Sequence, residues 1–560
     1  MPNLWTIDYL VMGLHLSIMV GVGIFFYKRV KSTDDFFKSG SKLPWGVAAL
    51  SSFMSSFSAW TFTGGAGKIY SFGVSGAILV LGGGIALVLA YFFLAAKYRR
   101  ARIITIVQFL QERYNIITHQ FYSWLYVLMK LFIVGLQLLA ASVFIAVALK
   151  INLNYVIIIA GLTMLSYSVL SGLWGVATND SLQFMIVMAI TLIAAPLSLN
   201  AVGGFSELVA KAPEHYFSIG NGELDQFYLF GWLLLMFFGN NSNASVQRYF
   251  SVEDEKAAKN VALLSSILFF AGVAVWMIPS MSARIMFPDL SGYVSGLKNP
   301  SEASYVVMCM TVLPHGLIGL LLAGVFAATM SSLDSSYNVM AAVIVEDIYA
   351  KYFKPNSSKK HLMLVSRLTV LGIGILTVFL ALFFTHNKGG VFGVMKDISQ
   401  VLTVPIGSAL IFGLLIRRTP PWTALLSFVF TFIVAFYTRY VLNLHLGLQA
   451  ILVVGTAFGV FMISKLWWNN VKAQDKERID MFFVKLDTPV DKEKELEKGT
   501  TADAVSMMKV IGTLLMIVGV IVLSPIIYLS DAFSIEITAS LGIIMFTTGI
   551  LMFLKGKRKA

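Results

Sequence analysis

Three aspartates lie within or beside long apolar runs, where a charged side chain needs a partner. Asp334 occurs in AGVFAATMSSLDSSYN, Asp180 in GVATNDSLQF, and Asp397 begins another apolar stretch. A charge at the bilayer centre costs about 2.5–3.5 kcal/mol on insertion scales, so such residues usually face a cavity, an ion or a partner. The simpler interpretation is a helix N-cap for Asp180 and Asp397, and an interior hydrogen bond for Asp334.

Serine hydroxyls surround Asp334. Ser331, Asp334 and Ser335 share one helical face, because residues three and four apart are neighbours on a helix. Hydroxyl and carboxylate oxygens suit a hard monovalent cation such as sodium, and no His or Cys stands beside them as a transition metal would require. If Asp180 lies close to Asp334, a sodium ion or a proton must separate the two charges. Sodium and proton both remain open for this second cation site.

The elements that must position these residues are apolar helices. The chain has 560 residues, of which 57% are hydrophobic and only 13% are charged. An ordinary soluble domain carries about 25% charged residues, so lipid is the expected solvent. The net charge of +13 is spread in short clusters between apolar runs, which argues against a nucleic-acid partner. Neither HExxH nor GxSxG occurs, so we do not expect an enzyme.

A helix needs about 20 apolar residues to cross the hydrocarbon core. By this criterion we predict about fifteen spans, with the segment 307–346 too long for a single perpendicular one. The predicted spans are 5–27, 43–71, 74–96, 121–149, 153–173, 179–203, 226–250, 260–287, 307–346, 363–385, 397–416, 421–441, 447–467, 508–530 and 533–554.

The distribution of Lys and Arg predicts the orientation, because cytoplasmic loops carry an excess of both. Loops on one side are rich in them, whereas the opposite loops hold little beyond Lys211, Lys298 and Lys388. We therefore expect a multi-pass protein of the cell (plasma or inner) membrane, with its N-terminus outside and its C-terminus in the cytoplasm. The basic clusters lie at 28–42, 97–113, 248–259, 351–360 and 417–418, and in the C-terminal tail.

Two of the predicted spans contain residues that interrupt a helix. Serines crowd the middle of 43–71 and three glycines follow, while 226–250 contains GNNSN. Non-helical backbone persists in a membrane only where it is buried in protein or lines a cavity. Two interrupted helices five spans apart indicate an inverted-repeat transporter with its site near the midplane. Ordinary packing of Ser and Gly between helices is the alternative.

Several stretches together resemble the sodium/solute symporter family, which contains the sodium/glucose, sodium/proline and sodium/sialic acid symporters. They occur in the family's order, and the similarity spans roughly residues 1–467. The matching stretches are STDDFFKSGSKLPW at 32–45, TIVQFLQERYN at 105–115, GLWGVATNDSLQ at 172–183, SVQR at 245–248, and the long run from Leu313 to Tyr349.

The resemblance implies an all-α polytopic fold with LeuT-like inverted five-helix repeats and additional flanking helices. The repeats would be 43–203 and 226–416. The expected remaining parts are a first span and cytoplasmic loop at 1–42, flanking spans at 421–467, a mixed-charge cytoplasmic loop at 468–506 that we expect to be a solvated helix or linker, and C-terminal spans with a basic tail at 507–560.

The resemblance also implies one sodium site, and in some members a second. The main site would take two backbone carbonyls from the first broken helix and three groups from the eighth helix. The matching positions are Met54 and Phe57, with Ala328, Ser331 and Ser332 opposite; for the second site they are Asp180, Ser331, Asp334 and Ser335. Asp334 departs from the two-sodium sialic acid symporters, in which a hydroxyl stands there.

The implied substrate positions match the sugar-binding members poorly and leave the solute open as a sugar or polyol, an amino acid or an organic acid. Asp397 stands where a sugar-binding glutamine would be, and AGKIY at 66–70 is closer to the sialic acid branch. The expected substrate residues are Ser56, Ser58, Trp60, Thr61, Val80, Leu235, Phe238 and Asp397.

The function expected from these features is sodium-coupled symport of a small polar organic solute into the cell by alternating access. The expected partners are the solute, one or possibly two sodium ions and the lipid bilayer, with the oligomeric state open. Two alternatives remain. One is a membrane sensor that keeps the transporter fold and signals through 468–506, and the other is a proton-coupled symporter.

The embedded Lys68 and Lys130 would pair with a carboxylate or extend to the interface.

Overall fold

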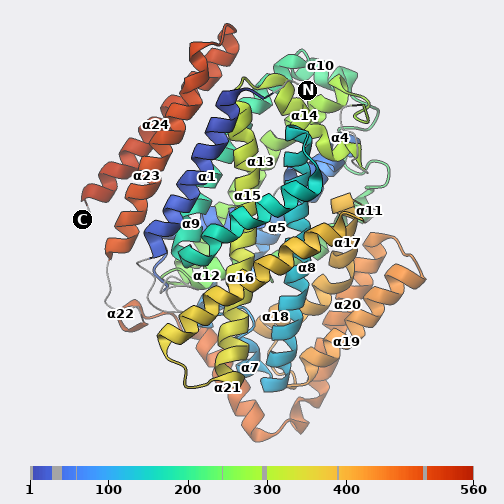
Figure 1. Cartoon of the computed structure of the whole chain (residues 1–560). Helices are drawn as coiled ribbons and strands as arrows, with labels where there is room; N and C mark the ends of the chain where they lie inside the picture. Colours follow the sequence, from blue (N-terminus) through green and yellow to red (C-terminus); the bar gives the residue numbers. More distant parts are fainter. Residues whose placement is uncertain are drawn as a thin grey trace.

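The described part of the chain folds as an all-helical bundle. The computed structural model describes residues 4–27, 41–57, 60–242, 244–292, 299–386, 390–495 and 501–558. Within these ranges the chain is helical, and its only β-type pairing is an isolated bridge between Asn221 and Leu224. Figure 1 shows the helices gathered in one bundle, with the C-terminal pair α23 (Thr501–Leu523) and α24 (Ala532–Arg558) along one edge.

The described helices match the predicted spans. Eleven of them are long and apolar enough to cross a membrane, judged by length and composition, and three shorter helices are also apolar. Together with the interrupted helix at 45–72, they coincide with all fifteen predicted spans. The main helices outside the two interrupted ones are α1 (Thr6–Tyr27), α5 (Val74–Phe93), α8 (Ile116–Leu149), α9 (Leu153–Ala201), α13 (Glu255–Met286), α15 (Leu317–Ala342), α16 (Lys359–Phe384), α17 (Gly390–Ile398), α18 (Val404–Leu415), α19 (Thr423–Phe436) and α20 (Leu446–Ser464).

Two helices show how the bundle divides between lipid and interior. Helix α16 exposes Leu364, Leu368, Leu371, Ile375 and Phe379, which are three or four residues apart and form one apolar stripe. Such a stripe is expected where a helix faces lipid. Every residue of α15 is buried, including its serines and its aspartate. Helix α15 therefore lies at the centre of the bundle, where it can contribute to a site.

Both predicted interruptions are confirmed. The first span divides into α3 (Trp45–Ser56), a π-helical turn (Thr61–Gly65) and α4 (Ala66–Phe72). Its helix ends because Phe57 adopts an extended conformation, with φ −108° and ψ 125°. The second divides into α11 (Gln226–Asn240), a short 3₁₀ turn (Ala244–Val246) and α12 (Gln247–Phe250).

The predicted single segment 307–346 is wrong at its beginning. The chain forms α14 (Ser304–Val312) and then α15, which a π-helical segment (Val343–Phe353) extends. Pro314 lacks an amide donor, and Gly316 has φ +83°, a conformation that glycine adopts without strain. The carboxylate of Asp8 accepts hydrogen bonds from the amides of Gly316 and Gly319 at 2.6 and 2.9 Å, which satisfies the first turn of α15.

The predicted spans 153–173 and 179–203 are joined in the structure. Residues Leu153 to Ala201 form one helix, α9, in which Pro196 lacks the amide that would donate a helical hydrogen bond. The five residues between the two predictions, WGVAT, contain no proline, so no missing amide stops the helix there. The two apolar segments remain distinct by composition, at Leu153–Leu165 and Val176–Ala201.

The segment that we expected to be a solvated helix or linker is helical but not fully solvated. Residues Ala473–Asp487 form α21, which is followed by the short α22 (Lys492–Glu495). Ile479, Phe482, Phe483 and Leu486 of α21 are buried. Their spacing of three and four residues places them on one face, which explains why this charged helix packs against the bundle.

Candidate functional site

A cavity of about 110 Å³ lies beside the break between α3 and α4. Four of the expected substrate residues line it, namely Ser56, Trp60, Thr61 and Val80. Ser58 lies outside the described residues. The break therefore opens the first interrupted helix onto a cavity in the bundle interior, as the sequence pattern indicated.

Three other expected substrate residues are not among those lining the cavity. Leu235 and Phe238 are each 2% exposed, and Phe238 packs edge-on against Phe412 with ring centroids 5.6 Å apart. Asp397 instead forms an ion pair with Arg439, at 2.7 Å between Oδ1 and Nη2. These residues belong to the helix packing around the cavity.

The helical register explains the position of Asp397. Met395, Ser399 and Thr403 line the cavity and are spaced four residues apart, so they share one face. Asp397 lies midway between the first two and points to another side of the helix. Ser399 and Thr403, at the two ends of the π-helical turn Ser399–Thr403, line the cavity. The resemblance alone placed Asp397 at the substrate site.

Residues that were predicted for the main sodium site lie close together where α3 ends against α15. The hydroxyl of Ser332 donates toward the carbonyl oxygens of Met54 at 3.1 Å and Phe57 at 2.8 Å. The helix stops at Ser56, so its last carbonyls lack the usual intrahelical amide partners, although the Met54 carbonyl also accepts a hydrogen bond from the amide of Phe57 at 3.2 Å. Unwound carbonyls facing hydroxyls are a sodium-binding arrangement in transporters.

The other two predicted ligands of this site lie on the same face of α15. Ala328, Ser331 and Ser332 are three and four residues apart and are all buried. The hydroxyl of Ser331 interacts with the carboxylate of Asp180, which joins this face of α15 to the second set of predicted ligands. Among the described residues, no cluster of His, Cys, Asp or Glu competes as a metal site.

The predicted second cation site contains an arginine that sequence reasoning missed. Arg248 of α12 is fully buried and forms an ion pair with Asp180, at 3.2 Å between Nη2 and Oδ2. The same guanidinium donates to Ser335 at 2.7 Å and to Ser51 at 2.9 Å. Ser51 also donates to the Asp180 carboxylate. We call Arg248, Asp180, Ser51 and Ser335 the Arg248 cluster.

The two predicted carboxylates have different partners. Asp334 accepts a hydrogen bond from Ser168 of α9, whereas Asp180 is held by Arg248 and Ser51. Arg248 also interacts electrostatically with Asp334. Arg248 therefore brings a positively charged side chain to the two aspartates. An arginine within an apolar stretch directly after a helix break was the sequence signal for it.

Lys130 of α8 is the cationic side chain in the cavity lining. It is 2% exposed, and its Nζ lies 5.5 Å from the centre of the Tyr126 ring. The described lining contains no Asp or Glu, and its other polar side chains include Thr61, Gln137 and Asn240. The sequence marked Lys130 as embedded but did not connect it with the cavity, because α8 is remote in sequence from both helix breaks.

Comparison with known proteins is consistent with this geometry. The model of the sodium:solute symporter family matches residues 36–430. The sodium/sialic acid symporter NanT of Aliivibrio fischeri is 24% identical, over 87% of this chain and 98% of its own length. The human sodium/myo-inositol cotransporter 2 is 27% identical, over 74% of this chain, which spans 66% of that relative's length.

A solved structure has the same fold. It is a sodium-coupled sialic acid symporter in a substrate-bound outward-open state, with a TM-score of 0.72 and 20% identity. The match covers 84% of this chain and 98% of that one. The family model matches most of the chain, and the fold is LeuT-like with two interrupted helices. This chain therefore belongs to the sodium:solute symporter family, whose members couple the transport of small organic solutes to sodium.

Proposed function

We propose that the protein imports a small carboxylate-bearing solute together with one sodium ion, by alternating access. The observation that carries the sodium assignment is the contact of Ser332 with the carbonyls of Met54 and Phe57 at the end of α3. In this proposal Ala328 contributes its carbonyl and Ser331 its hydroxyl. The site joins α3 to α15, so an occupied site holds one conformation of these helices.

One sodium ion supplies sufficient energy. An ion crossing 100 mV provides about 2.3 kcal/mol, and a tenfold concentration gradient adds about 1.4 kcal/mol. Their sum supports accumulation of several hundred-fold. We propose a single ion because Arg248 already carries a positive charge to Asp180 at the predicted second site. A second sodium there would have to share the Asp180 carboxylate with the guanidinium.

Lys130 supports a carboxylate as the recognised group. A buried ammonium is stabilised when an anion enters the same low-dielectric cavity. Relatives of the chain are named for sialic acid and for myo-inositol, so the family accommodates both an acid and a polyol. The lysine favours the acid class, which includes organic acids and amino acids.

Replacing Ser332 with alanine should raise the sodium concentration for half-maximal uptake roughly tenfold, because it removes one ligand worth about 1.4 kcal/mol. Sodium-activation curves measured in proteoliposomes test this value. The parent curve should have a Hill coefficient near one for a single ion. Equally fast uptake in sodium-free choline buffer would refute sodium coupling, and strong pH dependence there would favour a proton-coupled symporter.

A membrane sensor with the same fold is the second candidate. The observation that favours it is that α21, a charged helix, packs one face against the bundle. Counterflow of a labelled solute in proteoliposomes separates the two functions. A transporter exchanges internal for external solute, whereas a sensor binds the solute without moving it.

The proposed orientation places α21 in the cytoplasm. In a Cys309→Ala background, Val484→Cys should resist an impermeant maleimide on intact cells and react only after lysis. Val484 is 64% exposed, so burial cannot explain resistance. The matched control is Lys211→Cys, an exposed position of α10 (Phe205–Lys211) on the opposite side, which should react on intact cells. Labelling of Val484→Cys without lysis would overturn the orientation.

A further inference from the structure

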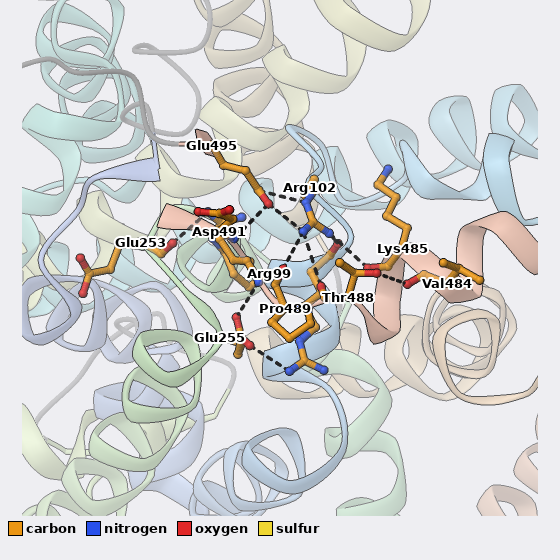
Figure 2. A network of polar contacts seen from close by, with 12 residues as sticks. Arg99, Arg102, Glu253, Glu255, Val484, Lys485, Thr488, Pro489, Asp491 and Glu495 are labelled. Atoms are coloured by element: carbon orange, nitrogen blue, oxygen red, sulfur yellow. Dashed lines mark hydrogen bonds and ion pairs between the residues drawn. The ribbon is translucent and has the colours of Figure 1, made fainter. Parts of the chain in front are cut away.

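The segment from Ala473 to Glu495 crosses the face of the bundle that we assign to the cytoplasm. Figure 2 shows its C-terminal part against Arg99 and Arg102, which follow α5. Arg102 forms a two-point ion pair with Glu495, at 2.7 and 2.9 Å. Its guanidinium also donates to the carbonyls of Lys485 and Pro489, each at 3.1 Å. Arg102 thus contacts this segment at three residues, namely Lys485, Pro489 and Glu495.

The same end of the segment contacts the beginning of α13. The ammonium of Lys492 lies 2.9 Å from Glu253 and 2.6 Å from Asp254. The amide of Val490 donates to Glu255 at 3.2 Å, and Glu255 also pairs with Arg100 of α6 (Ala95–Arg100) at 2.9 Å. These contacts tie the segment to α6 and α13, which pack against each other.

The N-terminal part of the segment, α21, packs against α6 as well and adds contacts to a second group of helices. Lys485 pairs with both carboxylate oxygens of Glu112 in α7 (Phe109–Arg113), at 2.9 and 3.0 Å. Phe482 stacks on Phe109 with ring centroids 5.8 Å apart. Asp487 pairs with Arg417 at 2.5 Å, directly after α18. Helix α7 packs against α8 and α18. The N-terminal end of the segment is therefore tied to α7 and α18, whereas its C-terminal end is tied to α6 and α13.

At the C-terminal end of the segment, the ion-paired side chains carry opposite charges. Partial burial tends to raise the pKa of Asp254, but hydrogen bonds from Lys492 and from backbone amides outweigh it and leave this pKa below its usual range. Hydrogen bonds to Asp254 and Glu253 raise the pKa of Lys492. These groups therefore keep opposite charges at cytoplasmic pH, and the contact persists as an ion-pair network.

The bundle is closed on this same side. The Arg248 cluster lies one helical turn toward the N-terminus of α3 from Ser55 and Ser56, which line the cavity. All four of its side chains are buried, so the helices pack together at this level between the cavity and the face that we assign to the cytoplasm. Alternating access in inverted-repeat transporters requires groups of helices to move relative to one another around the site.

We propose that residues 473–495 act as a cytoplasmic strap, which stabilises the cytoplasm-closed conformation by joining α6 and α13 to α7 and α18. Opening toward the cytoplasm then requires one end of the strap to detach. Its ion pairs are partly exposed and individually weak, which makes detachment accessible. The strap sets the balance between conformations without contacting sodium or the solute.

The test measures opening directly. Ile133 lines the cavity, and Ile133→Cys in a Cys309→Ala background reports access when inside-out vesicles are treated with an impermeant maleimide. Lys485→Glu places a like charge against Glu112 and should raise the labelling rate about two- to fivefold. Glu495→Gln, which weakens the opposite end, should raise it in the same direction. Raised ionic strength should reduce the difference from the parent.

Two further variants make the result decisive. The charge exchange Glu112→Lys with Lys485→Glu restores the pair and should return the rate to the parent value, which a folding defect would not do. Lys211→Glu disrupts an exposed ion pair within α10 and should leave the rate unchanged. An unchanged rate in Lys485→Glu, or no recovery in the exchange, overturns the strap. Labelling needs no transported solute, so this failure is distinct from failure of the proposed symport.

Discussion

Replacing Arg248 with methionine should abolish sodium-dependent uptake and lower the thermal stability of the purified protein. The substitution leaves the buried Asp180 carboxylate without its ion-pair partner and removes donors to Ser51 and Ser335. Breaking a buried pair by removing one partner costs about 3–5 kcal/mol, because an uncompensated charge remains in the interior. Thermal unfolding in detergent and uptake in proteoliposomes measure the two effects.

Two controls separate the buried charge from the loss of a large side chain. Adding Asp180→Leu to Arg248→Met removes the unpaired carboxylate and should recover much of the thermal stability, but not the uptake. Arg439→Met breaks the Arg439–Asp397 pair, whose side chains are 23% and 40% exposed, and should cost less than about 1 kcal/mol. Parent-like stability and uptake in Arg248→Met would show that Asp180 does not depend on the guanidinium.

The architecture was largely predictable because lipid imposes a strong pattern on sequence. Each membrane helix needs a long apolar run, and each of the fifteen predicted runs overlaps described helices, although two runs share α9 and one crosses the break between α14 and α15. The two interruptions were also visible, since serine, glycine and asparagine accumulate where a helix must stop. The break at Pro314 and Gly316 was missed, because the apolar run continues through it and hydropathy does not register a turn of four residues.

The site was predicted only where it depends on one helix or on a backbone break. Ser332 and the carbonyls of Met54 and Phe57 do meet, since a helix end and a serine pair are local features. Asp397 was misplaced because a match in sequence does not fix which side of a helix faces the cavity. The contacts of Arg248 join four helices, and no local pattern in one of them specifies such a tertiary arrangement.

Lys130→Met should raise the KM for a carboxylate-bearing solute about 100-fold, equivalent to about 2.7 kcal/mol. Truncating one member of a buried charge pair commonly costs 2–5 kcal/mol, because the other charge stays desolvated without a partner. Here that charge is the carboxylate of the solute in a cavity whose described lining offers no other cation. Lys130→Arg keeps the charge and should retain part of the affinity.

The solute itself is found by a sodium-dependent thermal-shift screen of acids, amino acids and polyols.

A double-mutant cycle with the solute tests whether the lysine and the carboxylate interact directly. The neutral amide of the solute should bind the parent protein far more weakly than the acid, and Lys130→Met should add little further loss for the amide. Sodium affinity, measured without solute, should stay near the parent value, because the proposed sodium ligands lie on α3 and α15 whereas Lys130 lies on α8. If a neutral polyol is the preferred solute and binds Lys130→Met as tightly as the parent, the assignment of a carboxylate is wrong. Sodium coupling through Ser332 would stand in that case, since the two sites use different side chains and different measurements.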